Sequence, residues 1–117
     1  MAAPNIVNVT TITGKTTVQA VGTSATAIVE NTAASGKVLK INFLLVSNVD
    51  GTNNADITVD IFRSSTAYRL ANVITVPAKG SLELLTKPLY LEEGDAIRLT
   101  ASATGDLEAV CSYEEIS

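Results

Sequence analysis

The residues that most often carry out chemistry are scarce in this 117-residue chain, which has no His and a single Cys. Without His there is no Ser-His-Asp or Cys-His triad, no imidazole base and no His-ligated zinc. Cys111 lies in an alternating apolar stretch, so we expect a buried small side chain rather than a reactive thiol. Acidic neighbours at Glu108, Glu114 and Glu115 would raise the pKa of the thiol further. The sequence therefore predicts a protein that is not an enzyme.

Three local patterns are similar to ligand sites but lack what such sites need. The tripeptide GKT at residues 14–16 matches the end of a phosphate-binding loop, yet the glycine needed five residues earlier is Val9. That loop must also lead into a helix, and a strand is expected here. The turn EEGD at 92–95 and the loop DGTNNAD at 50–56 offer carboxylates, but without the number and spacing that calcium needs. We expect solvated turns, and we predict no catalytic residue, cofactor or metal.

The composition indicates which elements must carry these residues. The chain contains 12 Val, 9 Ile and 15 Thr, whose branched side chains fit a pleated sheet better than a helix. No stretch shows a clear helical period, and eight to ten short strands are separated by turns. This pattern predicts an all-β, single-domain antiparallel β-sandwich that is jelly-roll-like. Residues 1–36 would form an N-terminal arm and the first strands, and residues 37–117 the core of the same domain.

The strongest strand signal is KVLKINFLLVS at 37–47, where alternate apolar residues share one face. We expect Leu39, Ile41, Phe43 and Leu45 on that buried face. In the strand at 95–103 we expect Ile97, Leu99, Ala101 and Ala103 on one face. The loop after residue 47 is rich in turn formers and predicts a hairpin with the strand at 56–63. In the same way, the turn at 104–106 predicts a tight hairpin between 95–103 and the last strand, 107–116.

The charge of the chain limits its partners. The formal net charge is −4, so no basic field draws the chain to nucleic acid. No apolar run approaches the ~18 residues of a membrane-spanning helix. The opening MAAPNIVNVT lacks the basic and apolar regions of a signal peptide, so we expect synthesis in a host cytoplasm without secretion.

The N-terminal segment is the candidate for contacts between chains. Residues 1–36 hold one base and one acid, whereas residues 83–117 hold 8 acids and 2 bases. An uncharged, apolar arm can extend and add a strand to the sheet of a partner. The predicted assembly interface consists of Ile6, Val7, Val9 and Ile12.

The stretch from Val38 to Ile116 resembles a known kind of protein. The runs VLKINFLLVSNVDGTNNADITVDIFRS, VITVPAKGSLELL and LYLEEGDAIRLTASATGDLEAVCSYEEI are similar to a small structural protein of marine tailed bacteriophages, notably those of cyanobacteria. The ending from LEEGD to SYEEI is the most specific part of the likeness. The resemblance implies a component of the virion and brings no catalytic residue with it.

Three functions follow from these observations. The first is a capsid decoration (cement) protein that binds the outer surface of the major capsid protein shell and stabilises it, with a homotrimer as the expected state. The second is a tail, baseplate or fibre-associated module that contacts the host surface. The third is a soluble carbohydrate-binding jelly roll, which needs convergent polar or aromatic side chains that His-free and Trp-free sequences supply poorly.

Overall fold

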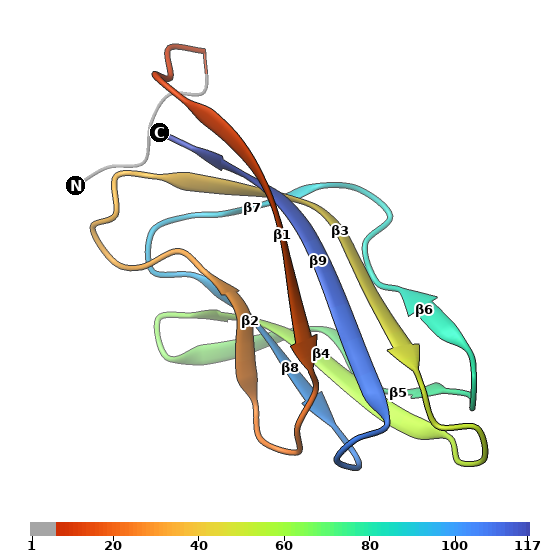
Figure 1. The fold of residues 1–117 in the computed structure, drawn as a ribbon. Helices are drawn as coiled ribbons and strands as arrows, with labels where there is room; N and C mark the ends of the chain where they lie inside the picture. Colours follow the sequence, from red (N-terminus) through yellow and green to blue (C-terminus); the bar gives the residue numbers. More distant parts are fainter. Residues whose placement is uncertain (1–6) are drawn as a thin grey trace.

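The regular elements of residues 7–117, which the computed structural model describes, are all β-strands (Figure 1). They are β1 (Ile12–Ala20), β2 (Thr26–Glu30), β3 (Val38–Asn48), β4 (Ala55–Arg63), β5 (Thr66–Val76), β6 (Ser81–Glu83), β7 (Leu89–Leu91), β8 (Ala96–Ala101) and β9 (Leu107–Ile116). None of the described residues forms a helix long and apolar enough to span a bilayer.

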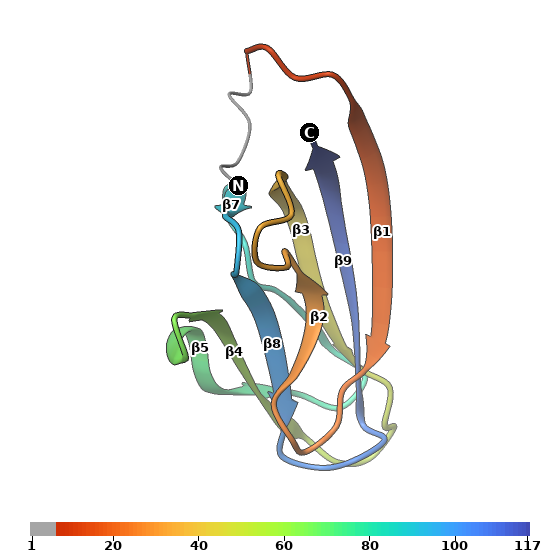
Figure 2. The same ribbon diagram turned by 90° about the vertical axis from the view of Figure 1, so that its left-hand side faces the viewer.

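The strands form two antiparallel sheets that pack face to face (Figure 2). One sheet has the order β1-β9-β3-β6, with β7 also paired to β3, and the other has the order β2-β8-β4-β5. If β6 and β7 are taken as two pieces of one strand, this is the strand order of a jelly roll. The predicted all-β, jelly-roll-like sandwich is therefore confirmed.

Both predicted hairpins are wrong. β3 and β4 lie in different sheets, and so do β8 and β9. The loops at 49–54 and 102–106 do reverse the chain, but they carry it across the core from one sheet to the other. Turn-forming residues mark a reversal of direction without showing whether the next strand pairs with the last one or crosses to the facing sheet.

The core lies between the sheets and consists of aliphatic side chains from both. Its fully buried members include Ile41, Leu44, Val46, Ile57, Val59, Leu91, Ile97, Leu99, Leu107 and Cys111. The prediction for the strand at 95–103 is confirmed for Ile97, Leu99 and Ala101, which are buried, whereas β8 ends at Ala101 and Ala103 is half-buried in the loop that follows. The burial predicted for Cys111 is also confirmed.

An irregularity in β3 changes which of its residues face the core. Ile41 pairs with Tyr113 and Phe43 with Ser112, so Asn42 is an extra residue opposite the β9 strand. Such a bulge reverses the alternation of side chains beyond it. Leu39 and Ile41 are buried as predicted, but Phe43 and Leu45 point away from the core and are half-buried.

A buried asparagine joins the sheets where β3 ends. Asn48 is 3% exposed, and its side-chain amide donates to the carbonyls of Asn53 at 2.9 Å and Val76 at 3.0 Å. Its Oδ1 accepts the backbone N–H of Asp50 at 2.9 Å. One side chain thus satisfies three backbone groups at the point where the chain leaves one sheet for the other.

The inversion at Asn42 predicts unequal costs for two neighbouring substitutions. Leu44→Ala, at a fully buried position, is expected to lower the free energy of unfolding by about 2–5 kcal/mol. Phe43→Ala removes a larger side chain but exposes less buried surface, so a loss of about 1–2 kcal/mol is expected. Chemical denaturation of both variants measures the difference, and a larger loss for Phe43→Ala would show that β3 has the opposite orientation.

Candidate assembly surfaces

The predicted interface residues lie at and before the start of β1. β1 is an edge strand, paired on one side with β9 from Ile12 to Ala20. Val7 is 84% exposed and Ile12 58% exposed, while Val9 is half-buried. Ile6 lies outside the described residues. Two of the four predicted residues are therefore open to solvent, and the third is partly covered.

Hydrogen bonds attach the segment before β1 to the end of the chain. The N–H groups of Thr10 and Thr11 donate to the carbonyl of Ser117 at 2.7 and 2.9 Å, and the hydroxyls of Thr11 and Ser117 lie 2.9 Å apart. These contacts hold Thr10 and Thr11 beside the end of β9.

A second surface, which the sequence did not indicate, lies on β5 at the edge of the other sheet. Of the described residues, the large apolar side chains that remain exposed are Val7, Ile12, Val18, Val49, Tyr68, Leu70, Val73, Ile74 and Tyr90. Four of these nine belong to β5 and two to β1. Edge strands are normally protected by charges or proline, because their open backbone groups recruit other chains. Six exposed apolar side chains on two edges therefore make β1 and β5 candidate surfaces for contact with another chain.

The backbone of β5 explains why its apolar residues are exposed. Its pairing with β4 shifts register twice, between Ile57 and Val59 and between Val59 and Asp60. Val73 has a φ of 53°, which is strained for a β-branched residue. Its N–H donates to the Thr58 hydroxyl at 3.2 Å. These irregularities break the alternation that would otherwise turn half of the apolar side chains inward. The sequence of β5 therefore lacks the regular alternation of apolar residues from which an exposed face could be predicted.

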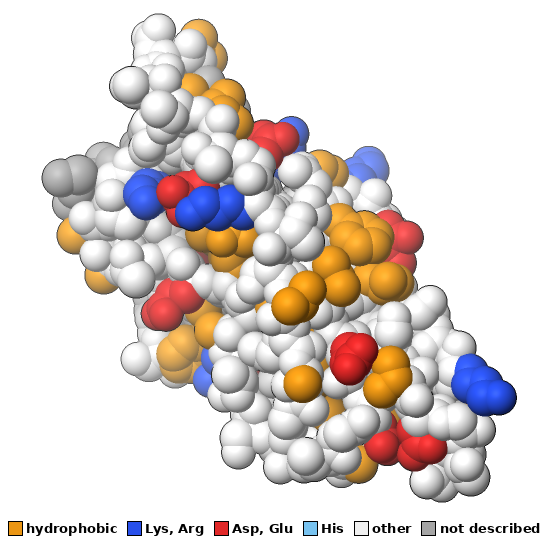
Figure 3. All heavy atoms as spheres, in the orientation of Figure 1, with side chains coloured by type: hydrophobic (Ala, Val, Ile, Leu, Met, Phe, Trp, Pro, Cys, Tyr) orange, Lys and Arg blue, Asp and Glu red, His pale blue; other side chains and the backbone are white. Residues whose placement is uncertain are grey.

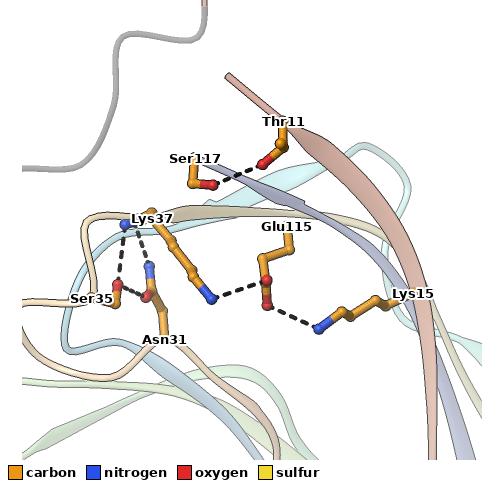
Figure 4. A network of polar contacts seen from close by, with 7 residues as sticks. All are labelled: Thr11, Lys15, Asn31, Ser35, Lys37, Glu115 and Ser117. Atoms are coloured by element: carbon orange, nitrogen blue, oxygen red, sulfur yellow. Dashed lines mark hydrogen bonds and ion pairs between the residues drawn. The ribbon is translucent and has the colours of Figure 1, made fainter. Parts of the chain in front are cut away.

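Ion pairs hold β1, β9 and the start of β3 together (Figure 4). The Glu115 carboxylate accepts from the ammonium groups of Lys37 at 3.0 Å and Lys15 at 3.2 Å. The hydrogen bond from Lys37 is the main reason that the pKa of Glu115 is lowered. Lys15 is the lysine of the GKT tripeptide. Its side chain is engaged in this structural ion pair. Both lysines are more than 40% exposed, and such pairs add little stability.

Asn31, also drawn in Figure 4, ties the end of β2 to the facing sheet. It is 2% exposed, and its amide donates to the carbonyls of Lys37 at 2.9 Å and Leu91 at 3.0 Å. The Ser35 hydroxyl donates to its Oδ1. An asparagine between two strands is typical of a solvated loop, so the sequence alone does not predict this role for Asn31.

The acidic turn at 92–95 has a structural role. Asp95, whose side chain is 2% exposed, accepts from Arg63 Nε at 2.8 Å and from Arg63 Nη2 at 2.5 Å. The N–H of Glu92 donates to the same carboxylate at 2.8 Å, while the Glu92 side chain accepts from Arg63 at 3.0 Å. Within residues 7–117, no three Asp, Glu or Cys side chains gather in a way that could hold a metal ion.

The tyrosines do not converge on one site. Tyr68 lies on β5 and Tyr90 on β7, in different sheets, and Tyr113 packs against the core. A hollow of about 270 Å³ is lined by Ile61, Arg63 and Tyr68, with one aromatic ring. Stacking platforms for sugars or bases use aromatic side chains next to each other. The described tyrosines therefore do not form such a platform.

The comparisons with known proteins show a likeness in fold. No family model matches the sequence, and no curated protein does. A solved structure from work described as "Bacillus endospore appendages form a novel family of disulfide-linked pili" has a similar fold, with a TM-score of 0.55. The alignment covers 100% of this chain and 96% of that chain at 12% identity. At this identity the likeness shows the fold alone.

Protonation of Asp95 is expected to weaken the fold at low pH. Hydrogen bonds from Arg63 hold the pKa of Asp95 below its usual 3.8 in the folded protein. The carboxylate therefore stabilises the fold above pH 3.8, and this contribution is lost as the pH falls toward the lower, folded pKa. Asp95→Asn should lower the free energy of unfolding at pH 7 by about 1–3 kcal/mol and flatten its dependence on pH below 4.

Glu92→Gln is the matched control, because its side chain is 67% exposed and its loss should change stability by no more than about 0.5 kcal/mol. Denaturation of both variants between pH 2 and pH 7 makes the comparison. Equal losses at pH 7 would contradict the role assigned to Asp95.

The Cys111 thiol is expected to be inert in the folded protein. Burial raises its pKa to about 11, from an ordinary 9.0, so the thiolate fraction falls roughly 100-fold. A thiol reagent at pH 8 should label Cys111 only after denaturation, and a non-reducing gel of the native protein should show no dimer. If the folded protein were labelled as fast as the denatured protein, the conclusion that the Cys111 thiol is buried would be wrong.

Proposed function

We propose that this chain is a non-enzymatic structural subunit of a phage virion. Within the virion, we propose a capsid decoration protein that binds the outer surface of the major capsid shell and stabilises it. The resemblance across Val38 to Ile116 supports the virion. The observation that carries the proposal is the open edge of β1, with Ile12 58% exposed and Val18 73% exposed, directly after an arm that is free of charged side chains. Subunits of symmetric assemblies cover such edges by pairing them.

The arm has the chemistry of a segment that pairs with a partner. Residues 1–9 contain no charged side chain and include Ile6, Val7 and Val9. Because Thr10 and Thr11 are bonded to Ser117, β1 keeps its place whether or not the arm is engaged. An arm of this kind adds main-chain hydrogen bonds to the sheet edge of a partner and places alternate side chains in its pockets.

A tail, baseplate or fibre module is the second candidate, and the fold neighbour favours it, since its description names pili. That description also names disulfide links, whereas the single cysteine of this chain is fully buried. Contacts between copies of this chain would therefore be non-covalent. For either candidate we propose a homo-oligomer, with a trimer as the favoured state.

Binding to capsid shells tests the decoration proposal. The full chain, mixed with virion shells stripped of their surface proteins, should sediment with the shells and raise the temperature at which they break open. A chain lacking residues 1–9 should remain folded and bind at least ~10-fold more weakly, since it loses the strand that pairs with the partner.

The circular dichroism spectrum and melting temperature of the truncated chain serve as the control for folding. Whole host cells provide the competing target. Binding to cells with no binding to shells would refute decoration in favour of the tail module.

A further inference from the structure

The outer edge of β1 pairs with no other strand of residues 7–117. On its inner side β1 pairs with β9 along its whole length without a register shift. Thr11 exchanges two backbone hydrogen bonds with Ser117, and the N–H of Val21 donates to the carbonyl of Leu107. Because hydrogen-bonded pairs alternate along an antiparallel ladder, the odd-numbered residues of β1 bond to β9. The N–H and C=O groups that point away from β9 are those of Ile12, Gly14, Thr16, Val18 and Ala20.

The described part of the chain does not protect this edge. β1 contains no proline and no bulge, two devices that commonly block edge strands. Its charged side chain, Lys15, turns toward Glu115 on β9 at 3.2 Å (Figure 4). In Figure 2 no other strand lies beyond β1. The edge is therefore open to a strand of another molecule over nine residues.

The side chains along this edge are arranged symmetrically by size about Thr16, the midpoint of β1. They lie on the outward face of the sheet, because the intervening Gln19 turns inward to the carbonyl of Ala27 at 3.0 Å. Figure 3 shows this face, on which apolar side chains gather. Ile12 and Val18 are 58% and 73% exposed, while a Cβ on Gly14 would meet no atom within 4 Å. Ile12 is as far from Thr16 as Ala20 is, and Val18 is as far as Gly14.

We propose that β1 of one copy pairs antiparallel with β1 of a second copy about a two-fold axis at Thr16. Val18 then lies opposite Gly14 and Ile12 opposite Ala20, so each large side chain faces a small one. The five pairs form about ten main-chain hydrogen bonds. The methyl groups of Val18 enter the open space over Gly14, which belongs to a hollow of about 290 Å³. A shift by one residue would leave two residues of each strand unpaired and set Val18 opposite Thr16 or Ile12.

The contact joins the β1-β9-β3-β6 sheets of two copies into one continuous sheet. Because it is isologous, it gives a dimer by itself and a hexamer if a three-fold contact also forms. The inference rests on the homo-oligomer proposed above and names one of its contacts, but it does not depend on the virion. It uses no residue before Ile12, so the role proposed for the arm is unchanged.

Thr16→Pro tests the contact. The substitution removes an N–H that points away from β9, and proline is tolerated on an edge strand at such a position. Light scattering of the full chain should give an even multiple of the subunit mass, and Thr16→Pro should halve it. Thr16→Val is the matched control, since it keeps the N–H and the branched shape, and it should keep the mass. The circular dichroism spectra of both variants should match that of the unaltered chain.

Cysteine pairing tests the register, and it does so even if Thr16→Pro does not fold. Thr16→Cys places two thiols at the two-fold axis with Cα atoms about 5.5 Å apart, within the range of a disulfide. Mild oxidation should therefore give a covalent dimer on a non-reducing gel. Val18→Cys alone should give none, whereas its equal mixture with Gly14→Cys should. The native Cys111 is buried and does not interfere.

The outcomes separate this contact from the proposals above. A monomeric unaltered chain would overturn the contact, and so would a covalent dimer from Val18→Cys alone with none from Thr16→Cys. An oligomer whose mass Thr16→Pro leaves unchanged would also overturn it, while leaving the proposed homo-oligomer in place. A halved mass without binding to shells would support the contact and refute the virion proposal alone.

Discussion

The two sheets are held together at their ends by buried asparagines, and the rest of the sandwich depends on this. Six of the eight connections between consecutive strands cross from one sheet to the other. Each crossing carries backbone carbonyl and N–H groups past the rim of an apolar core, where unpaired polar groups are costly. Asn31 and Asn48 satisfy such groups at opposite ends of the sandwich. Each donates hydrogen bonds to two backbone carbonyls across a crossing. Without them the strands would still suit a sheet, but the crossings would be poorly satisfied.

The strands themselves could be predicted from the sequence, because alternation of apolar residues has a local cause in the pleat. β8 and β9 are examples, with every inward residue from Ile97 to Cys111 where alternation places it. The bulge at Asn42 has no comparable local signal, and it reversed the faces of Phe43 and Leu45. The two hairpin predictions were wrong for a different reason. The packing of the whole sandwich decides whether consecutive strands pair with each other or lie in different sheets. The exposed apolar residues of β5 were not predicted, because the register shifts of this strand remove the alternation from its sequence.

The surface of the protein shows an uneven use of apolar side chains. A closed sandwich of this size can bury many of its aliphatic residues, and the inward-facing residues of β3, β8 and β9 are buried. The residues left outside are concentrated on β1 and β5 and in the outward row of β9 and β3. Within residues 7–117, Glu83, Glu108 and Arg69 form no ion pair, and they lie near these same areas. The fold thus separates a core that maintains the subunit from surfaces whose composition is that of an interface.

β1 is an edge strand that contributes no buried side chain to the core. None of its nine residues is buried, and its side-chain bonds are few, with Lys15 to Glu115 and the Gln19 amide to the carbonyl of Ala27 at 3.0 Å among them. The core closes over β9 without it. Local opening of β1 therefore requires far less free energy than global unfolding, and its amide hydrogens should exchange with solvent ahead of those of β9. A strand that leaves while the core persists can be exchanged between copies, so the subunit has a route to domain swapping that preserves its folded core.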